Sequence, residues 1–231
     1  MSASNLPRRL RQTQSQANDL WLRTQELGLL TWGKTEKALS DEIMILAKKE
    51  FGVKKYWHKR IVRSGPNTLE EYSKNLPDRL IQPDDILFVD FGPVFSLEEG
   101  QFEADYGRTI SLNQSNSHQR LILDLDVLFQ LGKEYYCSNP SMTGADLRQF
   151  MTHQAQCRGY ALAATHCGHI IGEFPHEKRL GDGHYQYICS ENTIPMNAPD
   201  CEGHPRYWVL EVHLIEPSGR FGGFYEDLLD V

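Results

Sequence analysis

The chain has 231 residues, 40% of them hydrophobic, which is enough to bury one large core or two small ones. Its formal net charge of −7 argues against a general binder of nucleic acids or anionic membranes, because either partner needs a broad basic face. The five cysteines are an odd number without a C-x-x-C pair, which fits neither a disulfide framework nor a thiolate zinc site, so we expect a reducing, cytoplasmic setting.

Two helical patterns fill the first part of the chain. Residues 6–30 are polar and Gln-rich, and they predict a mostly exposed helix that ends near Gly28. We therefore treat residues 1–32 as an N-terminal helical extension. A second helix is predicted from Thr35 to about residue 51, because apolar residues recur at helical spacing and Gly52 follows them.

Turn signals and short strands dominate the chain after this second helix. Residues 56–85 contain SGPN, NLPD and QPDD, which predict an irregular connection to two strand-like runs within residues 86–112. Helices are predicted from about residue 118 to 136 and from Thr143, and short strands near 168–172, 206–216 and 223–231. This mixture predicts an α+β fold, and since nothing resembles a linker we expect one domain over residues 1–231.

A nucleotide-binding motif offers one functional hypothesis. The segment GLLTWGKT, residues 28–35, matches G-x-x-x-x-G-K-[ST], and the apolar run before Asp90 resembles the strand that carries a magnesium-binding acid. A phosphate loop follows a buried strand, however, whereas the residues before Gly28 predict a helix. A P-loop nucleotide hydrolase is therefore only a remote alternative.

Asp90 and Asp105 lie inside the two apolar runs rather than in the turn between them. Opposite arms of an antiparallel hairpin place side chains on a common face, so the two carboxylates can point at one spot. Buried carboxylates without a partner repel, so a cation is expected between them. Arg108 and a metal ion are both open candidates.

The late strands add further carboxylates in apolar surroundings. In RYWVLEVHLIE the alternation places Glu211 on one face with Val209 and His213, and in GGFYEDLLDV Glu226 shares a face with Phe224. His169 lies near the start of the apolar run in THCGHIIGE. Each of these residues alone is compatible with a salt bridge or a hydrogen-bonded core position, but together they favour a metal site.

These segments resemble those of the pita-bread metallopeptidases, the family of methionine aminopeptidase, aminopeptidase P and prolidase. VDFG with Asp90 resembles the D-x-G strand, and EADYGRT with Asp105 resembles the (S/G)-D-x-T-R-T segment. GHIIGEFPHE with His169 resembles GHGIG…HE, LEVH with Glu211 resembles the IEP strand, and GGFYEDLL with Glu226 resembles R-x-E-D. The resemblance extends from about residue 33 to the C-terminus.

The resemblance implies a curved antiparallel sheet flanked by helices, in two pseudo-symmetric halves with the metals between them. It implies an aminopeptidase with two divalent metal ions. Manganese is our first choice of metal, and cobalt, iron(II) and zinc are the alternatives. Peptides are the implied substrates, and a homodimer is possible. The implied ligands are Asp90, Asp105, His169, Glu211 and Glu226.

Two further roles are implied by the resemblance. Glu211 is the implied proton shuttle. His176, the second histidine of the GHIIGEFPHE segment, is the implied catalytic and substrate-binding hydrogen-bond donor, with a surface-loop histidine as its simpler interpretation. Xaa-Pro peptides are our first choice of substrate and methionine removal the second. A pita-bread binding module without catalysis and a creatinase-like hydrolase without metal remain alternatives.

The sequence departs from the family pattern at three places. Asp90 and Asp105 are 15 residues apart, which predicts a hairpin lengthened by SLEEGQ at its tip. The family's upstream substrate-binding histidine is replaced at the usual distance by Tyr72, and His58 lies much further upstream. Glu216 competes with Glu211 for the IEP position, and we prefer Glu211 because its distance to Glu226 suits two adjacent strands.

Overall fold

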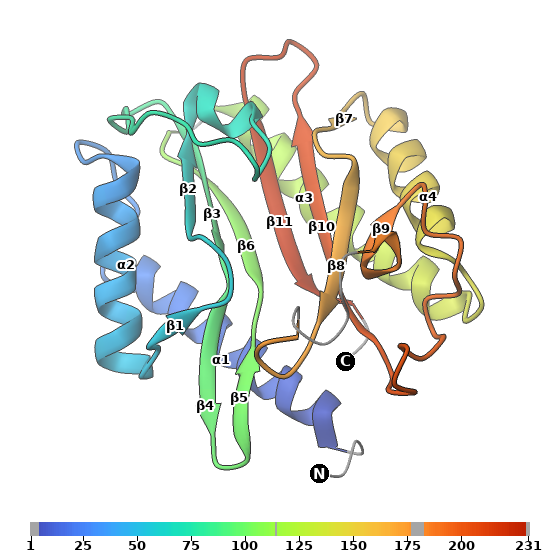
Figure 1. Cartoon of the computed structure of the whole chain (residues 1–231). Helices are drawn as coiled ribbons and strands as arrows, with labels where there is room; N and C mark the ends of the chain where they lie inside the picture. Colours follow the sequence, from blue (N-terminus) through green and yellow to red (C-terminus); the bar gives the residue numbers. More distant parts are fainter. Residues whose placement is uncertain (1–4, 114, 177–182, 230–231) are drawn as a thin grey trace.

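The computed structural model describes residues 5–113, 115–176 and 183–229 (Figure 1). Its helices are α1 (Leu6–Glu26), α2 (Glu36–Phe51), α3 (Asn116–Ser138) and α4 (Gly144–Cys157), with short 3-10 helices η2 (Gly65–Leu69) and η3 (His184–Gln186). Its strands are β1 (Lys55–Tyr56), β2 (Ile61–Ser64), β3 (Ile86–Phe91), β4 (Pro93–Leu97), β5 (Gly100–Glu103), β6 (Tyr106–Ser111), β7 (Ala161–Leu162), β8 (His166–Ile171), β9 (Tyr187–Cys189), β10 (Tyr207–Ile215) and β11 (Gly222–Leu228).

The main sheet is antiparallel and runs through the whole molecule. Its strand order is β2-β3-β6-β11-β10-β8-β9, and β7 pairs with the far end of β10. Strands from the first part of the chain, β2, β3 and β6, meet strands from the last part at the β6–β11 boundary. A smaller sheet, β1-β4-β5, continues from the ends of β3 and β6 (Figure 1).

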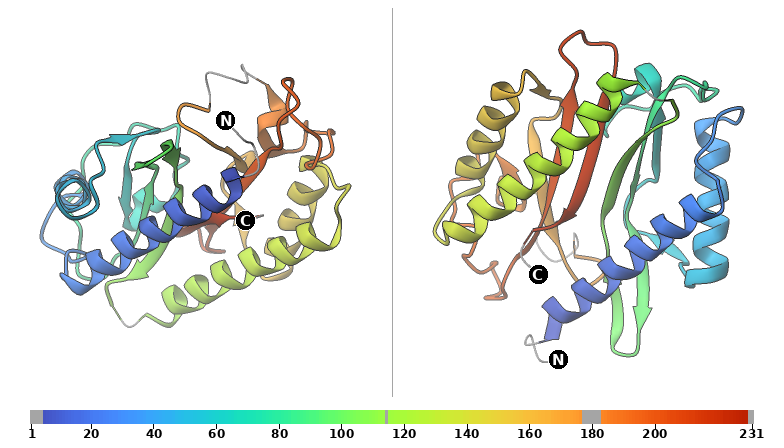
Figure 2. Two further views of the ribbon diagram at one scale, coloured as in Figure 1. Left: turned by 90° about the horizontal axis from the view of Figure 1, so that it is seen from below. Right: turned by 180° about the vertical axis from the view of Figure 1, so that it is seen from behind.

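The helices lie behind this sheet and divide its core into two parts (Figure 2). In the first part, α1 and α2 cover the outward side chains of β3, such as Leu87 and Val89. In the second, α3 and α4 cover the outward side chains of β10, such as Leu210 and Val212. The predicted α+β, pita-bread fold with two similar halves is confirmed, and the intervening residues of the strands are left facing away from the helices.

Several predicted helix ends match the structure closely. The Thr35 side chain accepts a hydrogen bond from the Ala38 N–H at the start of α2, and Gly52 ends the helix with a φ of 68°. Thr143 and Asp146 form a reciprocal capping box at the start of α4. The expectation that α1 is mostly exposed is wrong, because one face along its length is buried against the sheet.

The segment predicted to be an irregular connection contains a strand of the main sheet. β2 pairs with β3, and Ile61 lies opposite Asp90. All four residues of β2 are buried. Its sequence, IVRS, therefore lacks the alternation of apolar and polar residues that marks a half-buried strand. The early hairpin is lengthened as predicted, since β4 and β5 extend the two arms as far as the Leu97–Gly100 pair.

Residues 28–35 do not have the surroundings of a phosphate loop. They join α1 to α2, so a helix rather than a strand precedes them, and the Lys34 ammonium pairs with Glu42. The nucleotide-hydrolase alternative therefore has no structural support in this segment. Within the described part of the chain, no helix has the length and apolarity that a membrane crossing needs.

Candidate metal centre

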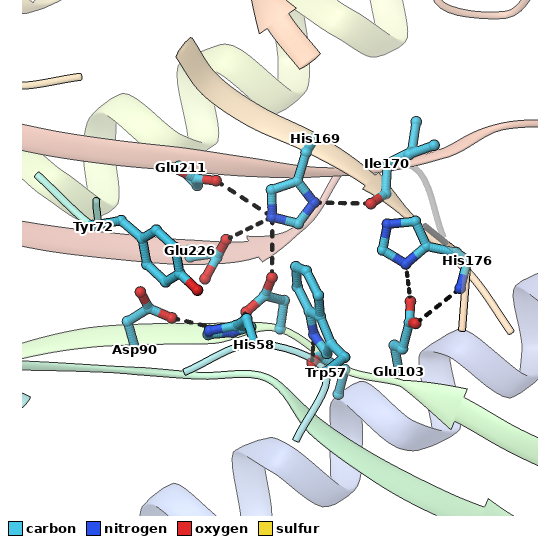
Figure 3. Close-up of polar contacts among 12 residues, drawn as sticks. Trp57, His58, Tyr72, Asp90, Glu103, His169, Ile170, His176, Glu211 and Glu226 are labelled. Carbon is cyan, nitrogen blue, oxygen red and sulfur yellow. Dashed lines mark hydrogen bonds and ion pairs between the residues drawn. The ribbon is translucent and has the colours of Figure 1, made fainter. Parts of the chain in front are cut away.

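Strand register brings three of the predicted ligands into one row. Asp90 of β3 and Glu226 of β11 both lie opposite Gly107 of β6, and Glu226 in turn lies opposite Glu211 of β10. Residues opposite one another on neighbouring antiparallel strands point to the same face, so these carboxylates all project from the face without helices. Their convergence is visible in Figure 3.

Asp105 and His169 join this row from its two sides. Asp105 precedes Gly107 by two residues, and His169 of β8 lies opposite Val209, two residues before Glu211. The His169 Nε2 lies 3.2 Å from Asp105 Oδ2, 3.4 Å from Glu211 Oε1 and 3.7 Å from Glu226 Oε1. The structure thus gathers all five predicted ligands. Glu216, in contrast, lies in the β10–β11 turn, where its carboxylate accepts from Ser218.

Gly107 leaves the space that this arrangement needs. A Cβ at this position would lie 2.4 Å from the ring of Phe224 and 3.0 Å from the Cβ of Glu226. The first contact is too short for any side chain and the second is tight, so only glycine fits on β6 between the carboxylates of β3 and β11.

The buried carboxylates perturb one another strongly. Burial raises the pKa of Asp90 to about 7 and that of Glu211 to about 7, and it raises the pKa of Glu226 well above its ordinary value. Burial would raise the pKa of Asp105 as well, but the imidazoles of His58 and His169 hold it below its usual range. Conversely, burial alone would lower the pKa of His169, but the facing carboxylates raise it well above the ordinary value.

Arg108 does not supply the cation between these groups. Its guanidinium lies between the rings of Tyr106 and Tyr225, donates to the Glu226 carbonyl and pairs with Asp227. Side chains alternate along β6, so Arg108 projects from the opposite face to Gly107. The arginine alternative for the Asp90–Asp105 pair is therefore wrong.

The residues present fit divalent metal ions. The Glu226 Oε2 is a buried oxygen without a hydrogen-bond partner among the described residues. At this centre, two groups of three donors have mutual separations within 4.8 Å, one formed by His58, Asp90 and Asp105 and the other by Asp105, His169 and Glu226. Carboxylate oxygens with a few imidazole nitrogens suit hard or borderline divalent cations. Asp105 belongs to both groups, as a bridging ligand would.

Comparison with known proteins agrees with this centre. The sequence model of metallopeptidase family M24 matches residues 8–227, which includes most of α1 and extends further toward the N-terminus than the motifs alone indicated. The chain belongs to metallopeptidase family M24. No curated protein sequence gave a match.

Solved structures share the fold of this M24 chain. A prolidase from Thermococcus sibiricus superposes with a TM-score of 0.76 at 19% identity, covering 97% of this chain and 56% of its own. The X-Pro aminopeptidase of Thermotoga maritima gives 0.73 at 19% identity, over 99% of this chain and 61% of its own. The dipeptidase PepE of Mycobacterium ulcerans superposes with a TM-score of 0.71 at 24% identity, covering 95% of this chain and 53% of its own. This chain therefore spans little more than half the length of these structures.

A second group of residues surrounds the centre of this M24 chain. His176 is buried, which rules out a surface-loop histidine, and its Nδ1 pairs with the buried carboxylate of Glu103 (Figure 3). The Trp57 indole donates to the Ala104 carbonyl at 3.1 Å, and its ring lies 5.4 Å from the ring of His176 and 5.1 Å from that of His169. The indole thus packs against both histidines.

Sequence reasoning set His58 aside as too far upstream of Asp90, and it missed Trp57 and Glu103. The His58 Nε2 lies 3.2 Å from Asp105 Oδ1 and 3.5 Å from Asp90 Oδ1, although it comes from a connection 32 residues before Asp90 in the sequence. Burial alone would lower the pKa of His58, but the two aspartates raise it to about 9. Tyr72, at the expected position of the substrate histidine, lies edge-on to His58 at 5.7 Å between ring centroids.

The centre opens into a cavity of about 230 Å³. One side carries the metal-binding candidates and His176, and the remaining walls are largely apolar or aromatic, with Trp57, Ile61, Tyr72, Phe88 and Phe224. Such a combination of a polar floor and apolar walls is typical of a small-molecule or short-peptide site.

Proposed function

We propose that this chain is a dinuclear-metal aminopeptidase that releases the N-terminal residue of short peptides, with Xaa-Pro sequences as its preferred substrates. The proposal rests on the row of Asp90, Glu226 and Glu211 across adjacent strands in a chain of metallopeptidase family M24. Manganese is our first choice of metal, because oxygen donors outnumber nitrogen donors in the row. Cobalt, iron(II) and zinc are other choices.

Each ligand has a proposed place. Asp90 would hold one ion, and His169 with Glu211 would hold the other. Asp105 would contact both, since it presents a different oxygen to each donor group, and the family resemblance gives Glu226 the same role. A bound pair of divalent ions supplies Lewis acidity and a water nucleophile of lowered pKa.

Glu211 is our proposed proton carrier. Burial raises its pKa to about 7 in the metal-free protein, and bound cations would lower it from there. A carboxylate is among the side chains that carry protons in general acid–base catalysis. Glu211 lines the cavity, so its carboxylate can take the proton of the attacking water and deliver it to the leaving nitrogen of the substrate.

His176 is our proposed donor to the oxygen of the scissile carbonyl. Its Nδ1 pairs with the buried carboxylate of Glu103, which fixes the orientation of the ring, and its side chain lines the cavity. A donor held in this way strengthens its hydrogen bond as negative charge develops on the carbonyl oxygen.

The shape of the cavity supports a short substrate with a compact side chain. About 230 Å³ accommodates a few small residues, and the aromatic walls suit the compact, apolar ring of proline. The similar solved structures include a prolidase and an X-Pro aminopeptidase, which favours proline over methionine as the specificity element. We propose that Tyr72 contacts the substrate from the cavity rim.

The cellular setting is also a proposal. All five cysteines, which lie among the described residues, are free, and this supports work in a reducing cytoplasm. The homodimer remains an expectation of the family resemblance.

Metal reconstitution tests the proposed activity. Protein stripped with a chelator and refilled with Mn²⁺ is expected to cleave a short Xaa-Pro peptide, and Glu211→Gln is expected to lose about 10²- to 10⁴-fold in kcat by losing the proton carrier. A parallel panel with N-terminal methionine peptides separates the two specificities. Metal-loaded protein that cleaves no peptide in either panel would exclude a peptidase and favour a binding module.

A further inference from the structure

Asp105 faces two different imidazoles, one from each side. Its Oδ2 lies 3.2 Å from the Nε2 of His169, and its Oδ1 lies 3.2 Å from the Nε2 of His58. Only His169 belongs to the ligand set that the family resemblance implies. The second imidazole therefore needs its own explanation.

The two histidines are oriented in the same way. The Nδ1 of His58 lies 2.7 Å from the carbonyl of Lys59, and the Nδ1 of His169 lies 2.8 Å from the carbonyl of Ile170. A carbonyl oxygen only accepts, so each Nδ1 carries a proton and donates it to the residue that comes next in the chain. Because Nδ1 is the donor to the carbonyl, Nε2 is the nitrogen that faces the carboxylates, and in the neutral form of each ring its lone pair is available to a metal ion, as in metal-ligating histidines.

The spacing of donor atoms is also the same on both sides. Donors about 2.1 Å from one ion lie roughly 3.0 to 3.5 Å from one another in octahedral or tetrahedral arrangements. The His58 Nε2 lies 3.2 Å from Asp105 Oδ1 and 3.5 Å from Asp90 Oδ1. These separations fall within the range of His169 and its carboxylate partners, which is 3.2 to 3.7 Å.

The fold provides a dedicated place for the ring of His58. Gly92, at the break between β3 and β4, has no side chain, and a Cβ there would lie 2.1 Å from His58 Cδ2 and 2.3 Å from its Nε2. Trp57 packs edge-on against the ring on another side, with 4.4 Å between centroids. The Tyr72 hydroxyl accepts from the N–H of Lys59, the residue whose carbonyl orients the ring. The side chain of His58 is consequently only 8% exposed.

We propose that His58 is a sixth metal ligand, which completes a three-residue position with Asp90 and Asp105. This proposal rests on the dinuclear centre proposed above and adds to it. Each ion then has one imidazole, whereas the five-ligand set leaves the Asp90 side with carboxylates alone. An added nitrogen donor shifts that position toward borderline ions such as Co²⁺ or Zn²⁺ relative to Mn²⁺.

Titration of chelator-stripped protein with Co²⁺, followed by calorimetry and by visible absorption, tests the proposal. Wild type is expected to bind two ions per chain, and His58→Ala is expected to bind one ion as wild type does and the second at least about 100-fold more weakly. His153→Ala is the control for the loss of an imidazole, because His153 is exposed on α4 and lies outside both donor groups. It is expected to retain both ions.

The outcomes separate this inference from the proposed function. Fewer than two ions on wild type would contradict the dinuclear centre itself. Two ions of unchanged affinity on both wild type and His58→Ala would overturn the sixth ligand alone and leave His58 as a substrate contact.

A second measurement needs no variant of His58. Paramagnetic Co²⁺ shifts the Nδ1–H protons of coordinated histidines far outside the normal NMR range, so the wild-type protein with two ions bound is expected to show two such exchangeable signals. One signal would restrict coordination to His169 and overturn the proposal, even if His58→Ala failed to fold.

Discussion

Glu226 is a residue of the centre that favours metal binding and destabilises the metal-free protein. Its side chain is 2% exposed, burial raises its pKa well above the ordinary value, and its Oε2 has no hydrogen-bond partner among the described residues. Keeping this carboxylate charged in the metal-free protein therefore costs free energy, which a bound cation offsets.

We predict that the effect of Glu226→Gln on stability changes sign when metal is bound. At pH 8 the metal-free variant is expected to be about 1–3 kcal/mol more stable than metal-free wild type, because a neutral amide replaces a buried acid, one oxygen of which has no hydrogen-bond partner among the described residues. With saturating Mn²⁺ the order reverses, since wild type gains more from binding. Thermal unfolding with and without metal measures both differences.

Asp227→Asn controls for the loss of a neighbouring acid. Asp227 points to the other face of β11, where it pairs with Arg108 and accepts from Gln14. Its replacement is expected to lower stability to a similar extent in both metal states. If Glu226→Gln remained more stable than wild type after metal was added, the charge explanation would be contradicted.

The residues that sequence reasoning found and missed differ in the kind of element that carries them. Asp90, Glu211 and Glu226 lie on regular strands, where strict alternation fixes the face of each side chain, so carboxylates among apolar residues were visible as a pattern. His58 comes from a connection between two short strands, and a connection has no period from which a direction can be inferred. The sequence showed it only as a histidine in an aromatic stretch, YWHK, further upstream of Asp90 than the family's substrate histidine.

Strand β2 escaped prediction for a related reason. It is four residues long and buried throughout, and turn residues come directly after it, so neither length nor alternation identified it. Helices α2 and α4, in contrast, carry their own end signals at Thr35, Gly52 and Thr143, and both were predicted.

The first turn of α3 provides a pH-dependent element away from the centre. His118 is buried there against the ring of Phe221, its Nδ1 lies 3.0 Å from the Ser111 hydroxyl, and burial lowers its pKa. Asp85 and Asp84 oppose this shift, and Arg220 adds to it. The N-terminal end of a helix also disfavours a cation.

We predict that His118 contributes to acid sensitivity. Because its folded pKa is below the unfolded value of about 6.5, the unfolded state takes up the proton first as pH falls, and the stability present above that value is progressively lost. His118→Gln is expected to flatten the decline in Tm below about pH 6.5. Parallel curves for variant and wild type would contradict this assignment.

At the scale of the whole molecule, the candidate centre lies where the two halves meet. Asp90 and Asp105 come from the first half, and His169, Glu211 and Glu226 come from the second. Each half has its own hydrophobic core, so the relative position of the halves decides whether the donors converge. Contacts that cross the boundary therefore influence metal binding as well as stability.

Helix α1 makes such a contact through Gln14. The buried amide of this residue donates to the Asp105 carbonyl at 2.7 Å and accepts from the Asp105 N–H at 3.2 Å, and it also donates to Asp227 of β11 at 2.9 Å. One side chain thus holds the irregular backbone around Asp105 and links it to a strand of the other half. Figure 2 shows α1 crossing behind the sheet toward both halves.

We predict that Gln14→Ala lowers both stability and metal affinity. Two backbone groups of Asp105 lose their partner in a buried place, which is expected to cost about 2–4 kcal/mol of unfolding free energy. Since Asp105 belongs to both donor groups, a less well-held Asp105 backbone is expected to lower the affinity for both ions by about tenfold or more. Denaturant unfolding and metal titration measure the two effects.

Gln12→Ala, at an exposed position of the same helix, is the control. If Gln14→Ala lost stability but bound both ions as tightly as wild type, α1 would support the core without positioning the centre.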